Sequence, residues 1–198
     1  GIYAAGATVS TSGTGADSDN LTIQNNHIKR AYYGIFVRGL SSTVLNDNLQ
    51  IVGNIIGSED PTEYVLYRGI DVTNAAAPLI SQNYVNNMRR TDGSNIAAID
   101  IGQNSAGAVI TQNRIHGIVQ ASSGGWGAYG INISSGTGNT NFLIANNAIT
   151  EISTMNYSAS STTYNPFGIR ITGGTGHKLY YNSVNLYGVQ GTAGGNPS

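Results

Sequence analysis

The sequence predicts an all-β protein, a β-solenoid of about six coils. Three observations lead to this prediction. An aliphatic pattern ending in asparagine returns about every 30 residues, and a second aliphatic pattern stands between its copies. The composition, with 27 glycines and many Asn, Ser, Thr and β-branched residues, favours short strands and turns over helices.

The first pattern is seen in "LIANNAI" at 143–149, where two amides stand between aliphatic residues. An aliphatic residue stands three positions before each repeated asparagine, and another stands two positions after it. The six asparagines follow one another at intervals of 28, 29, 30, 34 and 35 residues: Asn26, Asn54, Asn83, Asn113, Asn147 and Asn182.

The second pattern is "GIFV" at 34, "GIDV" at 69, "AIDI" at 98, "GINI" at 130 and "GIRI" at 168. Its period of two points two aliphatic side chains inward and one side chain outward. Each repeat therefore holds at least two strands. A period of about 30 residues made of short strands indicates a solenoid whose coils stack at roughly 4.8 Å.

Stacked coils bring the repeated asparagines into register, so each amide can hydrogen-bond to the asparagine of the next coil. Asparagine also tolerates the left-handed backbone of a sharp turn better than any residue except glycine. We therefore predict an asparagine ladder with a structural role. In "SSTVLNDNLQIVGNIIG" both Asn48 and Asn54 could join it, and the aliphatic context favours Asn54.

The strand-Asn-strand and "GIxI" pattern resembles the right-handed parallel β-helix repeat of the pectate-lyase-like superfamily, over nearly the whole chain. The phrases "YYNSVNLYG", "GIDVTNAAAPLISQN" and "LTIQNNHIKRAYYGIFVRG" also resemble repeats of large secreted surface proteins of Bacteroidetes-type bacteria. The resemblance implies a right-handed helix and an extracellular or cell-surface location. It does not choose a function, because lyases, glycoside hydrolases, adhesins and stalks share this fold.

The composition excludes several classes of binding partner. Only 10% of the residues are charged, the net charge is -1 and there is no basic cluster beyond Arg89-Arg90, so neither nucleic acid nor an anionic membrane is an expected partner. No apolar run is long enough to span a membrane. Cysteine is absent, which excludes disulfides and thiolate chemistry.

Residues 1–198 are predicted to form one solenoid segment whose two ends fall inside coils. We expect this segment to belong to a longer protein or to associate end to end.

The longest insertions gather on one side of the solenoid, before the "GIxI" strands. Two of these loops carry aromatic residues among small polar ones, namely Trp126, Tyr129, Tyr157, Tyr164 and Phe167. Exposed rings here could bind the faces of sugars, whereas rings that fold back would only cover the coil, and burial is the more frequent outcome for large apolar rings.

The residues at the outward position of the "GIxI" strands are the strongest candidates for catalytic or binding residues. Stacking makes Asp71 and Asp100 neighbours, roughly one coil spacing apart, with Arg170 two coils beyond Asp100. Two such carboxylates could cleave a glycosidic bond or hold calcium against an acidic sugar, and the arginine could bind a substrate carboxylate. The alternative is a solvated pair balanced by Arg68 and Arg38. The superfamily's enzymes do project catalytic residues from such a sheet, but the polygalacturonase-like and pectate-lyase-like motifs are absent here.

No sequence motif indicates a cofactor. The acidic stretches "ADSDN" at 16–20 and "SEDPTE" at 58–63 could take up calcium, but neither has the glycine and final glutamate of a calcium-binding loop. The favoured function is a structural or adhesive stalk segment of an extracellular bacterial surface protein. The alternatives are a carbohydrate-active lyase or hydrolase, and a non-catalytic glycan-binding module.

Overall fold

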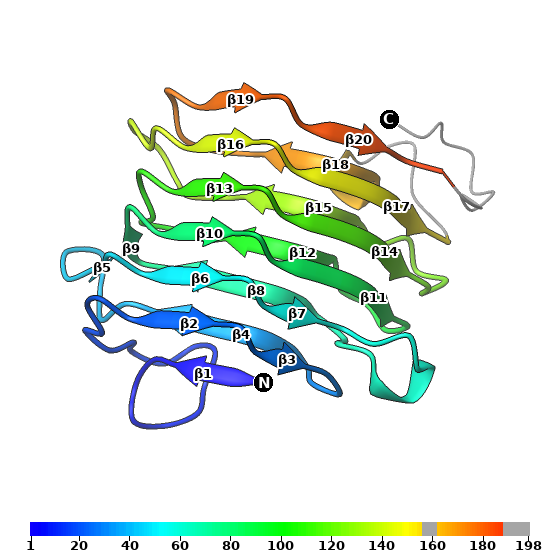
Figure 1. Cartoon of the computed structure of the whole chain (residues 1–198), viewed down its shortest axis with the longest axis horizontal. Coiled ribbons are helices and arrows are strands. Elements are labelled where there is room, and N and C mark those ends of the chain that lie inside the picture. Colours follow the sequence, from blue (N-terminus) through cyan, green and yellow to red (C-terminus); the bar gives the residue numbers. More distant parts are fainter. Residues whose placement is uncertain (156–161, 188–198) are drawn as a thin grey trace.

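The computed structural model describes residues 1–155 and 162–187, and it is a parallel β-solenoid of about six coils (Figure 1). Three parallel sheets, here named A, B and C, each contain six strands. The strands stack in chain order, with β1 (Ile2–Ala4) at one end and β19 (Lys178–Tyr180) and β20 (Ser183–Asn185) at the other. The predicted fold class is therefore confirmed.

Sheet A contains the "GIxI" strands: β1, β4 (Tyr33–Arg38), β8 (Arg68–Thr73), β12 (Ile96–Ile101), β15 (Ala128–Ile133) and β18 (Pro166–Ile171). Sheet B precedes the repeated asparagines: β2 (Thr22–Gln24), β6 (Gln50–Val52), β10 (Leu79–Ser81), β13 (Val109–Thr111), β16 (Leu143–Ala145) and β19. Sheet C follows them: β3 (His27–Ile28), β7 (Ile55–Ile56), β11 (Tyr84–Arg90), β14 (Arg114–Gln120), β17 (Ala148–Thr154) and β20.

A few short elements complete the described chain. β5 (Asn46–Asp47) pairs with β9 (Ala75–Ala76), and the 3-10 helices η1 (Pro61–Glu63) and η2 (Thr162–Tyr164) lie in the insertions before sheet A. The core is filled by aliphatic columns whose members pair in register from coil to coil. Sheet B contributes one that runs from Ile23 to Leu179, and sheet C contributes one from Ile28 to Val184.

The asparagine ladder is present and includes Asn54. In each step the backbone N–H and side-chain Nδ2 of one asparagine donate to the Oδ1 of the next, as when Asn83 donates to Asn113 at 3.0 Å through both groups. The same Nδ2 donates to a sheet B carbonyl of the coil before, here that of Ile51 at 2.9 Å. Because Asn83 and Asn113 are each 1% exposed, the ladder satisfies buried polar groups that water cannot reach.

The predicted left-handed turn lies one residue earlier than the ladder asparagines. The residues with φ near +60° are Asn25, Gly53, Gln82, Gln112, Asn146 and Tyr181. The reason is that the ladder amide must point into the coil, so the preceding residue makes the turn. Asn48 instead belongs to a second left-handed position, six residues before each ladder asparagine, together with Asn20, Ala77, Gly107, Asn141 and Gly176.

The glycine that begins the "GIxI" pattern, the second or third residue of its sheet A strand, faces the core. A Cβ built on Gly69 would lie 2.7 Å from Cγ1 of Val85 and 2.5 Å from the carbonyl oxygen of Ala98. Such contacts are too close for a side chain, so the glycine lets sheets A and C approach each other behind the strand.

Candidate functional site

The outward residues of sheet A form one continuous column. Adjacent strands pair Phe36 with Asp71, Asp71 with Asp100, Asp100 with Asn132, and Asn132 with Arg170. The structure therefore places the two aspartates on neighbouring strands β8 and β12, at one coil spacing, as their positions in the repeat predicted.

Both side-chain oxygens of Asp100 accept hydrogen bonds from other side chains. Its Oδ2 accepts from Nε of Arg68 at 2.5 Å, and its Oδ1 accepts from Nδ2 of Asn132 at 2.8 Å. The side chains of this ion pair are only 12% and 11% exposed. Arg68 therefore bonds to the aspartate of the next coil, whereas the sequence suggested that it would balance Asp71 beside it.

Arg170 is also engaged with the protein. Its Nη1 donates to Oδ1 of Asn132 at 2.9 Å, and its guanidinium lies 5.0 Å from the ring centre of Tyr129. The chain Arg68, Asp100, Asn132, Arg170 is thus a continuous polar network across four strands. The role of Arg170 toward a substrate carboxylate stays a prediction.

Asp71 has a different environment from Asp100. Burial, followed by the negative charge of Asp100, raises its pKa to about 7, while the charges of Arg68 and Arg38 act in the opposite direction. Among the described residues none hydrogen-bonds to this carboxyl. Asp71 is consequently a carboxyl that gains or loses its proton near neutral pH, and the neighbouring carboxyl of Asp100 is bonded to an arginine.

Next to Asp71, at the β1 end of the solenoid, lies a groove lined by aromatic rings, which we call the tyrosine groove. Its volume is about 630 Å³, and its lining is Gly1, Ile2, Tyr3, Val9, Ser10, Thr11, Tyr32, Tyr33, Phe36, Tyr67 and Ser94. Tyr3 stacks on Phe36, with ring centres 5.4 Å apart. Tyr33 stands nearly perpendicular to both Phe36 and Tyr67, at 78° and 88°, so the rings form a corner.

Asp71 lies beside the tyrosine groove, although it does not line it. It pairs in register with Phe36, and its charge is one of the influences, after burial, that raise the pKa of Tyr33 to about 12. Tyr32, at 47% exposure, is the most accessible of the five rings and marks the open side of the groove.

Two arginines support the far wall of the groove. The guanidinium of Arg68 lies 3.9 Å from the ring centre of Tyr67, and that of Arg90 lies 4.4 Å from the same centre. Arg90 is 6% exposed, forms an ion pair with Asp92 and also lies over Tyr32, 5.1 Å from its ring centre. These cation–π contacts hold the tyrosines in fixed orientations.

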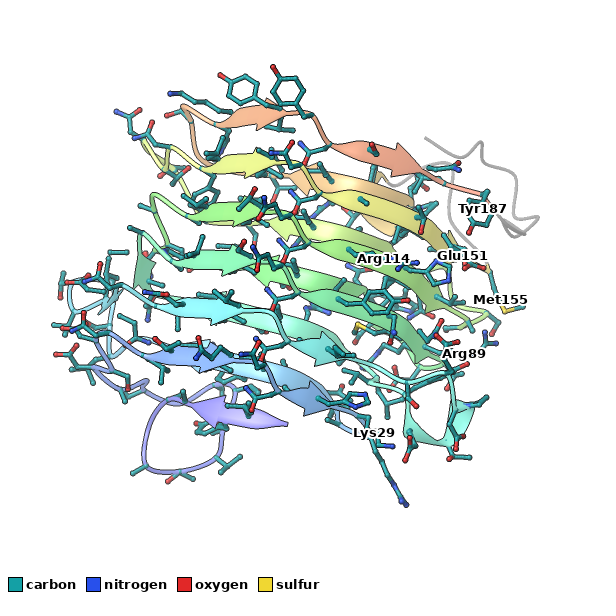
Figure 2. All side chains as sticks on the ribbon, in the orientation of Figure 1. Lys29, Arg89, Arg114, Glu151, Met155 and Tyr187 are labelled. Atoms are coloured by element: carbon teal, nitrogen blue, oxygen red, sulfur yellow. The ribbon has the colours of Figure 1, made fainter. Side chains whose placement is uncertain are left out.

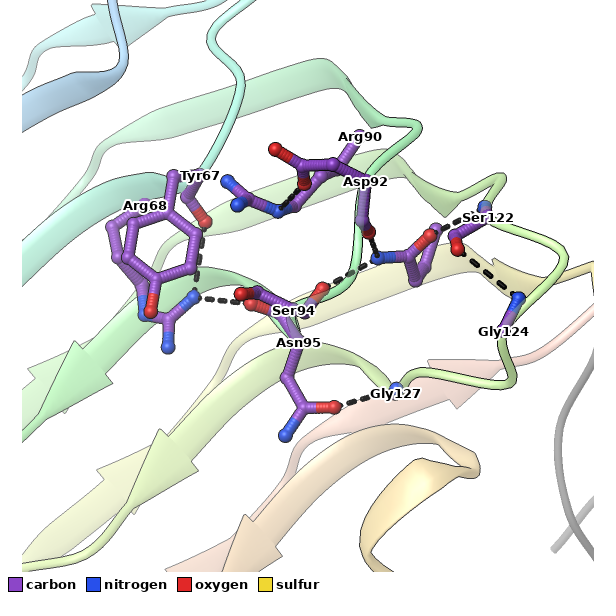
Figure 3. Close-up of polar contacts among 10 residues, drawn as sticks. Tyr67, Arg68, Arg90, Asp92, Ser94, Asn95, Ser122, Gly124 and Gly127 are labelled. Atoms are coloured by element: carbon purple, nitrogen blue, oxygen red, sulfur yellow. Dashed lines mark hydrogen bonds and ion pairs between the residues drawn. The ribbon is translucent and has the colours of Figure 1, made fainter.

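The loop 91–95 is pinned behind this wall, as Figure 3 shows. Nε2 of the buried Gln120 donates to the carbonyls of Asp92 and Ser94, at 3.0 and 2.5 Å. Nη1 of Arg68 donates to the carbonyl of Asn95 at 2.6 Å, and Oδ1 of Asn95 accepts from the backbone of Gly127 at 2.7 Å. Arg68 thus contacts Asp100, the ring of Tyr67 and the loop 91–95 at once.

The loop aromatics have unequal exposure. Tyr129 is 2% exposed, and its hydroxyl donates to the carbonyl of Thr163, so its ring offers no face to a sugar. Trp126 and Tyr164 meet edge to face, 5.2 Å apart, and remain partly exposed. Phe167 is tilted against Tyr129. Tyr157 lies outside the described residues, and sugar binding by this loop cluster stays a prediction.

The residues of the tyrosine groove were not predicted as a site. Of the five rings only Phe36 was recognised as pointing outward, and no binding role was assigned to it. A signal was present in the sequence, because an aromatic residue directly precedes the glycine of three sheet A strands, in "YG" at 33, "YG" at 129 and "FG" at 167. In the register of β4 and β8, Tyr33 pairs with Arg68 and Phe36 pairs with Asp71. Aromatic and charged side chains therefore lie next to each other on this face.

Other polar clusters lack comparable geometry. On sheet C, Nε2 of His116 lies 3.2 Å from Glu151 and its Nδ1 lies 3.1 Å from Oγ1 of Thr150, near the exposed Arg114 and Arg89 (Figure 2). A hollow of about 490 Å³, formed by residues that follow β12 and β15, is lined by uncharged residues, most of them polar. Within residues 1–155 and 162–187 no three His, Cys, Asp or Glu side chains are grouped as a metal site would need.

Comparisons with protein-family models, with curated proteins and with solved structures give no match to this chain. In the part of the chain that the structure describes, no helix has the length and apolar character needed to cross a membrane.

Proposed function

We propose that the chain is a rigid, adhesive segment of an extracellular bacterial surface protein and that it binds carbohydrate in the tyrosine groove. The observation that carries the proposal is the groove itself, in which five aromatic rings line about 630 Å³ beside the polar column of sheet A. Aromatic faces pack on the C–H faces of sugars, and the neighbouring hydroxyl and carboxyl groups can bond to sugar hydroxyls.

The scaffold supports this proposal. Each ring lies on a strand of sheet A or directly before one, and each such strand is paired within that sheet, so the five rings are positioned by the solenoid, although loop residues complete the lining. A stack of coils with a fully bonded ladder is stiff, which suits a segment that presents a binding face away from a cell surface. The surface-protein assignment rests on the resemblance of the repeat.

Replacing Tyr32 by alanine should weaken glycan binding about 10-fold or more, because it removes the most exposed ring of the groove and leaves the core untouched. Binding would be measured by a glycan array, followed by titration calorimetry on the oligosaccharides that bind. Tyr181→Asn is the matched control, since Tyr181 is 86% exposed on the last coil, and asparagine occupies the same left-handed position in two other coils. Equal binding by the wild-type chain and Tyr32→Ala would refute the assignment of the groove.

Cleavage of a glycosidic bond is a second candidate function, favoured by the raised pKa of Asp71, about 7, beside the arginine-bound carboxylate of Asp100. A protonated Asp71 could donate its proton to the leaving oxygen, and Asp100 could stabilise the developing positive charge or act as the base. Their strands lie one coil apart, roughly 4.8 Å, so the two carboxyl groups project from neighbouring positions of the same column, and a lyase would use the same pair.

The catalytic candidate predicts that Asp71→Asn and Asp100→Asn each abolish turnover while Tyr181→Asn does not. The measurement is release of reducing ends and unsaturated products from neutral and acidic polysaccharides, with and without calcium, by protein whose β-type circular dichroism shows it to be folded. If the folded wild-type protein releases no product, the catalytic candidate is rejected and the adhesive proposal stands.

A further inference from the structure

The hollow that follows β12 and β15 lies between long connections of the solenoid. Five segments join sheet A to sheet B, namely 39–49, 74–78, 102–108, 134–142 and 172–177. The first and the fourth are the longest. The hollow is lined by Ser42 of the first segment, 103–106 of the third and 135–140 of the fourth, whereas the short second segment contributes none of the lining. Its volume of about 490 Å³ therefore arises where long connections flank shorter ones.

The fourth segment bends around open space. Gly136 and Gly138 have φ values of +95° and +114°, a conformation that side chains with a Cβ rarely adopt. No atom lies within 4 Å of the position that a Cβ would take on either glycine. These two residues thus let the chain pass around the hollow without filling it.

The lining of the hollow is chemically uniform. It consists of serine, threonine, asparagine, glutamine, glycine and alanine. A calcium site would need carboxylates, and an anion site would normally use arginine or lysine. The lining is therefore suited to a neutral ligand that makes many hydrogen bonds, and it differs in this from the aromatic tyrosine groove.

Two buried serines in this lining have hydroxyl groups that the fold does not use fully. Ser135 is 4% exposed, and among the described residues no group bonds to its Oγ. Ser105, on the preceding coil, is 1% exposed, and its Oγ accepts a long bond of 3.4 Å from the backbone N of Ala75. Buried hydroxyls in folded proteins normally have partners, so these two groups point to a ligand.

Two asparagines of the lining are oriented by bonds that use only one end of each amide. Nδ2 of Asn104 donates to Oδ1 of Asn74 at 2.9 Å, and Oδ1 of Asn139 accepts from Oγ1 of Thr175 at 2.7 Å. The acceptor Oδ1 of Asn104 and the donor Nδ2 of Asn139 have no bonded group among the described residues. The hollow thus offers a fixed acceptor and a fixed donor beside the two serine hydroxyls.

We propose that this hollow is a second carbohydrate site, which holds a neutral sugar by hydrogen bonds alone. Sugar hydroxyls both donate and accept, as do the serine hydroxyls, and they match the free ends of the two amides. The volume lies within the range of about 300–1,000 Å³ found for small-molecule sites. The inference goes beyond the proposed function, because the hollow and the tyrosine groove share no lining residue.

The test is a nuclear magnetic resonance titration of the ¹⁵N-labelled chain with neutral tetrasaccharides of β-1,4-linked glucose, mannose or galactose, up to about 10 mM. We expect at least one of them to shift the amide signals of 103–106 and 135–140, with a Kd of about 1 mM. The same shifts should persist in Tyr32→Ala, which impairs only the groove. Sorbitol, an acyclic polyol with the same hydroxyl chemistry, should cause no shift at the same concentration.

Ser135→Ala should weaken the binding about 5-fold, because it removes one hydroxyl that bonds to the sugar. The melting temperature should not fall, since that hydroxyl has no described partner in the protein. Ser134→Ala is the matched control. Its Oγ donates to the carbonyl of Ile101 at 3.4 Å and does not line the hollow, so binding should be unchanged.

The outcomes separate the hollow from the groove. The second site is overturned if no tetrasaccharide shifts residues of the hollow, if those shifts vanish in Tyr32→Ala, or if sorbitol causes them equally. Equal affinities of Ser135→Ala and Ser134→Ala would also overturn it. Shifts at the hollow without any at Tyr32 would instead support the second site and count against the groove.

Discussion

The variant Asn83→Ala should lower the free energy of unfolding by about 4 kcal/mol and the melting temperature by about 10 °C. Oδ1 of Asn83 accepts from the backbone N and from Nδ2 of Asn54, both at 3.0 Å, and its Nδ2 donates to Ile51 and Asn113. Alanine leaves the buried backbone N–H of Asn54 without its acceptor and removes one hydrogen bond each from Nδ2 of Asn54 and from the carbonyl of Ile51. Each unsatisfied buried group costs about 1–3 kcal/mol, so the cost exceeds that of one hydrogen bond.

Asn26→Ala is the matched control, because Asn26 is the first member of the same ladder. It donates to Asn54 and to the carbonyl of Gln24, but no described residue donates to its Oδ1, and its side chain is only partly buried. Its replacement should cost about 1 kcal/mol or less. Thermal and denaturant unfolding of both variants would measure this difference. Equal losses would show that the ladder does not stabilise the interior coils in the way described.

Replacing Asp71 by asparagine should stabilise the protein at pH 8 by up to about 3 kcal/mol and have little effect at pH 4. The folded-state pKa of about 7 lies above the ordinary value of 3.8, so the folded protein holds this proton more tightly than the unfolded chain does. The stability that this carboxyl contributes is therefore fully present below about pH 4 and is lost as pH rises through about 7. Asparagine has the same shape, remains neutral and avoids that loss.

The measurement is the unfolding free energy of the wild-type chain and of Asp71→Asn between pH 4 and pH 8. Asp17→Asn, which removes an exposed carboxylate that does not line the groove, controls for the loss of one negative charge. A variant no more stable than the wild-type chain at pH 8 would mean that Asp71 is not held in a desolvated site.

The sequence predicted the architecture and part of the candidate site. The repeated asparagines and aliphatic residues identified the solenoid, the ladder and the choice of Asn54 over Asn48. The same periodicity placed Asp71 beside Asp100, because residues at equal positions in successive coils must pair. It misplaced the left-handed turn by one residue, since the pattern does not show which of two adjacent residues points into the coil.

The sequence by itself thus determined how the chain winds and which residues share a column. The reason is that coils of equal pattern stack with equal positions paired, so the repeat alone defines the register. Only the tertiary structure decided which partners those residues have. The directions of long side chains depend on packing across three or more coils, so the bond from Arg68 to Asp100 and the corner of rings around Tyr33 could not be read from spacing. In that packing Arg68 bonds to Asp100 and Arg38 to the carbonyl of Gly13, so among the described residues no cation bonds to Asp71, and burial raises its pKa.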